Sequence, residues 1–236
     1  FVAQFMLPGL MDKLALYPVV SEEFKPWQLA THFFMHSTHG LMHIFFNMFA
    51  LVMFGTQLER VWGPKRFLIY YIICAFGAAI LHQIVFHIEL NSMLSLIPEN
   101  DWLTMKSYGN TIIENNTTQN GRSIFLRKDP TYGVTITKEI LNAYQTISTP
   151  MLGASGAIFG LLAAFGYLFP NTELYLMFIP VPIKAKYFVI GYAAIELYSG
   201  IANNPGDNVA HFAHLGGALV GIIMVLIWQR QKNQFN

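Results

Sequence analysis

Five long apolar stretches constrain the fold of this chain more than any other feature of its sequence. They cover residues 33 or 41 to 58, 67 to 88, 151 to 169, 187 to 202 and 209 to 228, and the fourth is the shortest. A helix needs about 20 mostly apolar residues to cross a membrane. Charged residues make up only 11% of the chain, against about 25% in a typical soluble protein. We therefore predict an all-α, polytopic membrane protein built as a helical bundle.

Charge and cysteine content exclude several other classes of protein. The formal net charge of +1 provides no basic surface for a nucleic acid, so we expect no nucleic-acid partner. Cys74 is the only cysteine, which excludes a secreted domain held together by disulfides. The expected surroundings are the lipid bilayer, and the sequence leaves the oligomeric state open.

The short loops predict the orientation of the chain. If the apolar stretches alternate in direction, seven basic residues fall on one side of the membrane: Arg60, Lys65, Arg66, Lys184, Lys186, Arg230 and Lys232. Short loops rich in Lys and Arg remain cytoplasmic, so this side and the C-terminus are predicted to be cytoplasmic.

One membrane domain is expected over residues 1–228, followed by a short cytoplasmic tail at 229–236. Residues 91–149 form a polar insert on the opposite side, with a loop or disordered segment at 108–123 and a short helix at 138–147. The chain begins at Phe1 without an initiator Met. This indicates a fragment whose first residues are the end of a further helix or part of a removed signal.

Hydrogen-bonding groups within apolar stretches are expensive in a membrane and are therefore functional candidates. His43 and Asn47 are four residues apart, so they share one face of a helix. Ser155 lies in a run of small residues that leaves its hydroxyl accessible. His211 and His214 open the last apolar stretch. Because alternate stretches enter from the same side, these groups should meet at one depth.

The rise of a helix places this meeting point close to the non-cytoplasmic surface. Ser155 lies four residues after the start of its stretch, and His214 lies five residues after the start of its own. At 1.5 Å per residue, both lie within about 10 Å of the surface. A serine hydroxyl becomes a good nucleophile when a neighbouring base accepts its proton, and His214 is the candidate base. His43 and Asn47 are candidate donors to an oxyanion.

A carboxylate partner for His214 is not evident from the sequence. Glu196 is the only acid well inside the apolar stretches, and we place it on a helix that need not face the site. A Ser/His dyad is therefore favoured over a triad. Each residue also has a simpler interpretation: Ser155 and His214 as helix packing, His43 with Asn47 as an interhelical hydrogen bond, and His211 as a structural or supporting residue.

Three motifs together resemble the rhomboid family of intramembrane serine proteases. They are Gly153-Ala154-Ser155-Gly156, Ala213-His214-Leu215-Gly216-Gly217 and His43-Ile44-Phe45-Phe46-Asn47. The resemblance runs from about residue 27 to 228, apart from the insert. It implies a six-helix core whose first helix is largely missing here, with the catalytic serine at the start of the fourth helix.

The resemblance also assigns roles to residues of this chain. It implies a catalytic dyad of Ser155 and His214, and an oxyanion site formed by His43, Asn47 and the backbone N–H of Ser155. Phe159, where relatives often have Tyr, would pack on the imidazole. The small residues expected to bring helices into close contact are Gly156, Gly160, Gly217 and Gly221. In place of the family's Trp-Arg pair, this chain has Trp27-Gln28.

These observations predict an intramembrane serine endopeptidase that cleaves transmembrane segments of other membrane proteins and needs no metal or organic cofactor. We expect it in a bacterial plasma membrane, with the active site open to the non-cytoplasmic side. Two alternatives remain. One is a non-catalytic rhomboid-like protein that binds transmembrane segments. The other is a metal-dependent membrane oxidoreductase, which the eight histidines, including His32 and His36, would suit.

Overall fold

The computed structural model describes residues 2–7, 9–38, 41–116, 127–176, 179–202 and 209–234. The chain divides into two compact units. The first contains Phe1–Leu16, Lys25–Gln83 and Met151–Asn236, and the second contains Tyr17–Phe24 and Ile84–Pro150. The predicted insert at 91–149 thus lies within the second unit.

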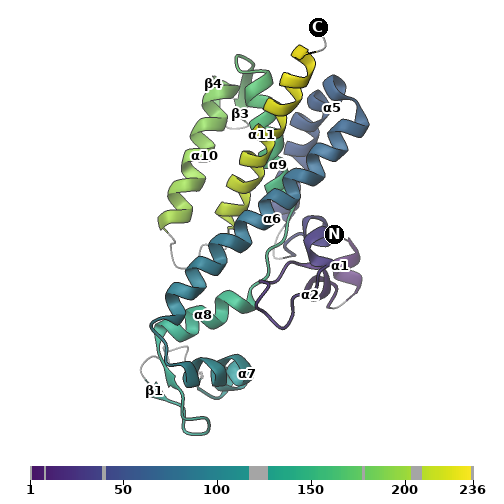
Figure 1. Cartoon of the computed structure of the whole chain (residues 1–236). Helices are drawn as coiled ribbons and strands as arrows, with labels where there is room; N and C mark the ends of the chain where they lie inside the picture. Colours follow the sequence, from purple (N-terminus) through teal and green to yellow (C-terminus); the bar gives the residue numbers. More distant parts are fainter. Residues whose placement is uncertain are drawn as a thin grey trace. The chain divides into compact units, whose positions relative to one another are not determined.

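The first unit is a bundle of helices (Figure 1). Its principal elements are α4 (Leu41–Ala50), the π-helical η2 (Leu51–Gly55), α5 (Thr56–Trp62), the first part of α6 (Pro64–Leu94), α9 (Ser155–Leu168), α10 (Ala185–Ala202) and α11 (His211–Gln234). Among the described residues, Leu41–Trp62, Pro64–Leu94 and His211–Arg230 are long and apolar enough to cross a membrane. The prediction of a polytopic helical bundle is confirmed.

Several predicted boundaries differ from the structure. Of the two starts expected for the first apolar stretch, the structure supports Leu41, because Phe33 belongs to the short 3-10 helix η1 (His32–Phe34), and the helix continues to Trp62 beyond residue 58. The third begins at Ser155, because Gly153 has φ +114° and interrupts any helix before it. The last apolar stretch, expected over residues 209 to 228, forms α11 from His211 to Gln234.

The short helix α9 is the centre of the first unit. Its residues from Gly156 to Gly166 are buried, and it contacts α4, η2, α5, α10 and α11. Glycines allow this packing: a Cβ on Gly217 of α11 would overlap the carbonyl group of Gly156, and one on Gly221 would lie 3.0 Å from the Cα of Gly160. The two backbones therefore touch, which brings the first turns of α9 and α11 together.

The N-terminal segment contains α1 (Val2–Met6), α2 (Leu10–Leu14) and α3 (Gln28–Thr31). The pair at 27–28 anchors it, because Trp27 Nε1 and Gln28 Nε2 both donate to the carbonyl oxygen of Lys13, at 3.0 and 3.5 Å. Gln28 is fully buried. The Gln28 amide therefore ties this segment to the residues around Lys13, a role that the sequence did not predict.

The second unit has a hydrophobic core of its own. It contains the last part of α6, the helices α7 (Glu99–Asn116) and α8 (Lys138–Ser148), and an antiparallel pair of short strands, β1 (Arg127–Lys128) and β2 (Thr135–Ile136). Met105, Ile112, Ile136 and Ile140 are fully buried in this core. Thr137 begins α8, since its hydroxyl accepts a hydrogen bond from the Ile140 N–H (3.2 Å). The predicted helix at 138–147 is confirmed.

The predicted loop at 108–123 is wrong over residues 108–116, which form the end of α7. Local composition favoured a loop, but tertiary packing decides otherwise: Ile112 is buried, and Gly109 leaves room for the ring of Tyr144 from α8. Residues 117–123 lie outside the described part of the chain.

A second antiparallel pair of strands, β3 (Glu173–Leu176) and β4 (Ile179–Lys184), precedes α10. The all-α prediction did not include these strands.

Candidate active site

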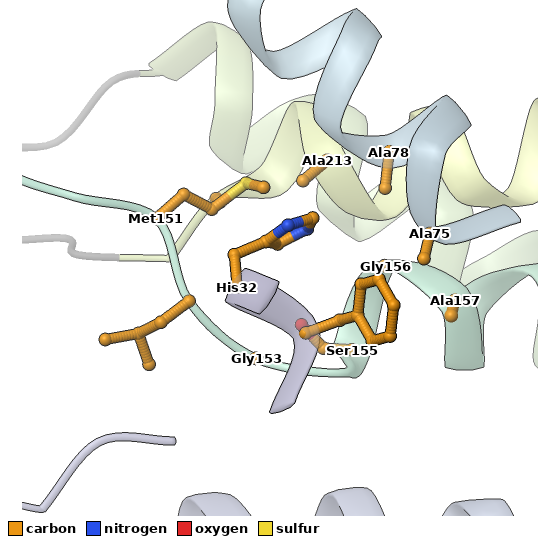
Figure 2. Close-up of a pocket in the computed structure, with 12 residues that line it drawn as sticks. His32, Ala75, Ala78, Met151, Gly153, Ser155, Gly156, Ala157 and Ala213 are labelled. Carbon is orange, nitrogen blue, oxygen red and sulfur yellow. The ribbon is translucent and has the colours of Figure 1, made fainter. Parts of the chain in front are cut away.

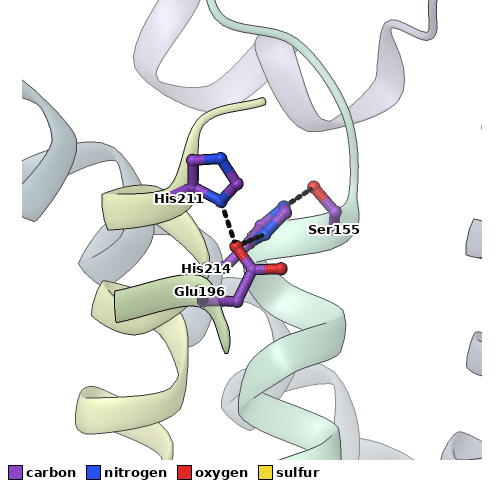
Figure 3. Close-up of polar contacts among 4 residues, drawn as sticks. All are labelled: Ser155, Glu196, His211 and His214. Carbon is purple, nitrogen blue, oxygen red and sulfur yellow. Dashed lines mark hydrogen bonds and ion pairs between the residues drawn. The ribbon is translucent and has the colours of Figure 1, made fainter. Parts of the chain in front are cut away.

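Ser155 and His214 meet at the start of two neighbouring helices. Ser155 is the first residue of α9, and His214 lies in the first turn of α11. The distance from Ser155 Oγ to His214 Nε2 is 2.8 Å, which is a hydrogen bond (Figure 3). The structure thus brings together the two residues that the sequence singled out as nucleophile and base. Their position follows from the backbone contact of α9 with α11.

The extended residues before Ser155 are held by the N-terminal part of the chain. The backbones of Met151 and Leu16 exchange two hydrogen bonds of 2.8 Å, and the N–H of Gly153 donates to the carbonyl oxygen of His32 (3.1 Å). Gly153 has a positive φ that L side chains rarely adopt. A Cβ there would also lie only 3.1 Å from the His43 ring. Glycine at this position therefore lets the chain turn into α9 beside His43.

His214 has a second hydrogen-bond partner in Glu196. The Glu196 Oε2 atom lies 2.9 Å from His214 Nδ1 and 2.6 Å from His211 Nδ1 (Figure 3). Glu196 is buried, on α10. The prediction that this residue need not face the site is wrong. Apolar side chains occupy most faces of α10. The sequence therefore has no polar face that would predict the direction of the carboxylate.

A signal for Glu196 was nevertheless present in the sequence. Acidic residues are almost never buried without a partner, and Glu196 is an acid well inside an apolar stretch. The two histidines at the start of α11 are the basic groups that such a carboxylate would need. His211, for which a structural or supporting role was expected, is one of the two donors that hold it.

Phe159 covers one face of the His214 ring. The two ring centroids are 4.3 Å apart and the planes are almost parallel, at 6°. Phe159 lies four residues after Ser155, so it occupies the same face of α9 one turn further along. Tyr192 of α10 contacts Phe159 in turn, at 4.8 Å between centroids. These contacts restrict the imidazole to one plane, in which Nε2 points at Ser155.

His43 and Asn47 lie on α4. The Ser37 N–H donates to His43 Nδ1 (3.3 Å), so a neutral His43 carries its proton on Nε2. That Nε2 atom lies 3.1 Å from the point where a Cβ of Gly153 would be, and this point is 3.7 Å from Ser155 Oγ. Both atoms therefore lie within 4 Å of one point at Gly153. Asn47 is buried, and its Nδ2 donates to the His43 carbonyl oxygen (2.8 Å) on the same helix.

A small cavity lies behind Ser155 (Figure 2). Its volume of about 10 Å³ is close to what one water molecule requires. The lining is mostly small or apolar: His32, Phe33, Ala75, Ala78, Met151, Leu152, Gly153, Ser155, Gly156, Ala157, Ala210 and Ala213. The sequence considered His32 only for the metal-dependent alternative, and its buried ring lies at this cavity. Its Nδ1–H donates to the Gln28 carbonyl oxygen (3.0 Å), and burial lowers the pKa of His32 to about 4.

Glu196, His211 and His214 are also the described residues that could hold a metal ion, since their ligand atoms lie within 4.8 Å of one another. Zinc ligands lie about 2.0–2.2 Å from a tetrahedral ion, which keeps them roughly 3.3–3.5 Å apart. The contacts of 2.6 and 2.9 Å are shorter than this and have the lengths of hydrogen bonds. As arranged here, the three side chains form a hydrogen-bonded cluster.

Comparison with known families gives a match over most of the chain. A family model described as the Rhomboid domain matches residues 23–97 and 130–231, which is well over half of the sequence. The gap between the two matched segments falls within the second unit. Every side chain of the hydrogen-bonded site lies inside the matched segments.

Individual relatives cover the same region. The chain is 29% identical over 239 residues to RHOMBOID-like protein 12, mitochondrial, of Arabidopsis thaliana, with 100% of this chain and 54% of that protein covered. It is 29% identical over 183 residues to Rhomboid protein 1, mitochondrial, of Saccharomyces cerevisiae, with 71% and 47% covered. The chain thus spans about half the length of the curated relatives it matches. Their names indicate mitochondria, in contrast to the predicted bacterial membrane.

Proposed function

Because this chain belongs to the rhomboid family, we propose that it is an intramembrane serine endopeptidase that cleaves transmembrane segments of other membrane proteins. The observation that carries this proposal is the 2.8 Å hydrogen bond between Ser155 Oγ and His214 Nε2. A serine hydroxyl hydrogen-bonded to an imidazole, which is oriented by further groups, is the arrangement that activates a nucleophile for acyl transfer.

In the proposed reaction, Ser155 Oγ attacks the scissile carbonyl carbon while its proton passes to His214 Nε2. The C–N bond then breaks, and the imidazolium gives this proton to the leaving amine nitrogen. A water molecule attacks the resulting ester and gives its proton to Nε2, and breakage of the C–O bond returns the proton to Ser155. Donors from His43, Asn47 and the Ser155 backbone would stabilise the oxyanion in both halves.

The backbone N–H of Ser155 is suited to this task by its place in the fold. As the first residue of α9, it is one of the N–H groups that have no acceptor within their own helix. His43 Nε2, on α4, lies 3.1 Å from the position of a Cβ on Gly153, two residues before Ser155. Asn47 is the less available donor, because its amide already donates to the His43 carbonyl oxygen. We therefore expect Asn47→Ala to lower the rate less than His43→Ala does.

The length of α9 supports a site below the membrane surface. Its 14 residues rise about 21 Å, whereas the hydrocarbon core is about 30 Å thick. A helix that reaches one surface with its C-terminal end therefore starts well inside the membrane, at Ser155. We propose that this end opens to the non-cytoplasmic side. The preferred substrates are then transmembrane segments that unwind easily at Gly or other poor helix formers, since a regular helix hides its peptide bonds.

The names of the relatives bear on the compartment. We propose a mitochondrial membrane as the location of the full-length protein, in place of a bacterial one. Fractionation of cells that express a tagged full-length protein tests this: the tag should accumulate with mitochondrial membranes. Recovery in another membrane would contradict the proposed location. It would not bear on the proposed peptidase activity.

The peptidase is tested with purified protein in liposomes, a model transmembrane substrate and a fluorophosphonate probe. The wild type should cleave the substrate and become labelled, and Ser155→Ala should do neither. A folded wild type that binds the substrate without cleavage or labelling would favour the non-catalytic binder. A metal-dependent oxidoreductase would contain stoichiometric metal and would be indifferent to Ser155→Ala.

A further inference from the structure

We propose that Glu196 is a positioning residue for this chemistry. Its carboxylate holds His214 by Nδ1 so that Nε2 faces Ser155, and His211 holds the carboxylate in place. This inference rests on the proposed peptidase function, and it adds a third member to the serine–histidine pair.

The first argument is the geometry of the cluster. A single carboxylate oxygen, Glu196 Oε2, lies 2.6 Å from His211 Nδ1 and 2.9 Å from His214 Nδ1. The two histidines are three residues apart on α11, so both rings lie on the face that α10 covers. Glu196 is only 4% exposed, and a buried carboxylate is tolerated where hydrogen-bond donors compensate its lost hydration. Two donors meet at one oxygen here.

The second argument concerns the tautomer of His214. An ionised carboxylate only accepts hydrogen bonds, so the Nδ1 atoms of both histidines must carry the donated protons. A neutral imidazole carries one proton, which leaves His214 Nε2 with a free lone pair. That atom lies 2.8 Å from Ser155 Oγ. The carboxylate therefore selects the one tautomer that is able to accept the serine proton.

The third argument concerns charge during the reaction. When the Ser155 proton moves to Nε2 and the Oγ–C bond forms, His214 becomes a cation. Glu196 is then a fixed anion in direct contact with it, and it keeps its own electrons and gains no proton. Because the cluster is largely buried, this attraction is weakened less by water than it would be on a surface. The carboxylate should thus lower the barrier to acylation and have little effect on substrate binding.

His211 has a distinct task in this arrangement. Its ring is the closer partner of Oε2, and it is directed away from the serine (Figure 3). It holds the carboxylate through a second hydrogen bond, so that Glu196 does not turn away when His214 moves during proton transfer. Removal of His211 should therefore weaken the alignment of the site, while the charge beside His214 remains.

Glu196→Gln is the sharpest variant, because it removes the charge and keeps the size. In liposomes, we expect kcat to fall on the order of 100-fold or more with KM nearly unchanged, and fluorophosphonate labelling of Ser155 to slow in parallel. Glu196→Asp, which keeps a carboxylate, should recover part of the lost kcat. His211→Gln is the matched control on α11, and it should lose less activity than Glu196→Gln.

The outcomes separate this inference from the peptidase itself. If the wild type cleaves substrate and Glu196→Gln has the same kcat, the positioning role is overturned and the peptidase stands. A folded wild type that neither cleaves nor reacts with the probe removes the peptidase, and this inference with it. A merely structural contact would be revealed by a lower melting temperature of Glu196→Gln at an unchanged kcat.

A second measurement reports the tautomer of His214 in the wild-type protein, and a variant serves only to assign its signals. In protein labelled with ¹⁵N-histidine, the ring nitrogen shifts report which nitrogen carries the proton, and His214→Gln assigns the signals. At neutral pH we expect His214 to be protonated on Nδ1 with Nε2 bare. A proton on Nε2, with Nδ1 bare, would overturn the proposal whatever the kinetics show.

Discussion

At the scale of single residues, the orientation of one imidazole is the property on which the proposed chemistry depends. Phe159 covers the His214 ring face to face, and an aromatic pair of this kind contributes about 0.5–1.5 kcal/mol beyond its buried area. We expect Phe159→Leu, which stays apolar but loses the stacking, to lower kcat roughly fivefold, the equivalent of about 1 kcal/mol. Substrate cleavage in liposomes measures this loss.

Phe54→Leu is the control for Phe159→Leu. Phe54 is buried in the same unit and contacts the edge of Phe165, at 5.0 Å between centroids, away from His214. Its replacement should lower the melting temperature and leave kcat of the remaining folded enzyme unchanged. Equal loss of kcat in the two variants would mean that general packing, and not the stacking on His214, is responsible.

The burial of His32 predicts how the free energy of unfolding depends on pH. Burial lowers the pKa of His32 to about 4 in the folded protein, from 6.5 in the unfolded chain. Between these values the unfolded chain binds more protons, so the free energy of unfolding falls as the pH drops from 6.5 to 4, by up to about 3 kcal/mol. His32→Gln removes this contribution. The melting temperature of the variant should therefore fall less steeply over this range, and parallel curves would contradict the prediction.

At the scale of elements, the contact between α9 and α11 sets the distance from serine to histidine. A Cβ on Gly217 would overlap the Gly156 carbonyl group. This group is part of the α9 backbone and cannot move aside as a flexible side chain could. Overpacking of this kind typically costs about 1–3 kcal/mol. Gly217→Ala should therefore lower the melting temperature by several degrees and reduce cleavage at least tenfold, because the first turns of both helices separate.

Gly191→Ala is the matched control on α10. Apart from the local backbone of α10, nothing lies within 4 Å of a Cβ at Gly191, and alanine is the better helix former by about 1 kcal/mol. This variant should be as active as the wild type and equally or more stable. If Gly217→Ala behaves in the same way as Gly191→Ala, the close approach of the two backbones does not control the site.

The same elements explain what the sequence could and could not predict. Apolar length and alternation of direction predict that Ser155 and His214 lie at one depth, because both depend only on position along the chain. The orientation of Glu196 depends on rotation of α10, and a helix that is apolar on most sides has no periodicity from which to read it. The helical residues 108–116 depend on contacts with Tyr144, which are remote in sequence.

At the scale of the whole molecule, the two units have separate hydrophobic cores, one around α9 and one around Ile112 and Ile140. The side chains of the proposed site all belong to the first unit. Each unit should therefore be able to unfold locally while the other remains folded. We expect Ile112→Ala to destabilise the second unit by about 2–5 kcal/mol and to speed limited proteolysis between residues 98 and 148, while fluorophosphonate labelling of Ser155 stays at the wild-type rate.

Leu161→Ala provides the comparison from the first unit. Leu161 is fully buried in α9, six residues after Ser155, so its truncation leaves a cavity of similar origin in the core of the first unit. This variant should slow labelling and leave proteolysis of the second unit unchanged. Labelling that falls equally in Ile112→Ala and Leu161→Ala would show that the two cores unfold as one. In that case the second unit would be part of the framework that holds the serine against the histidine.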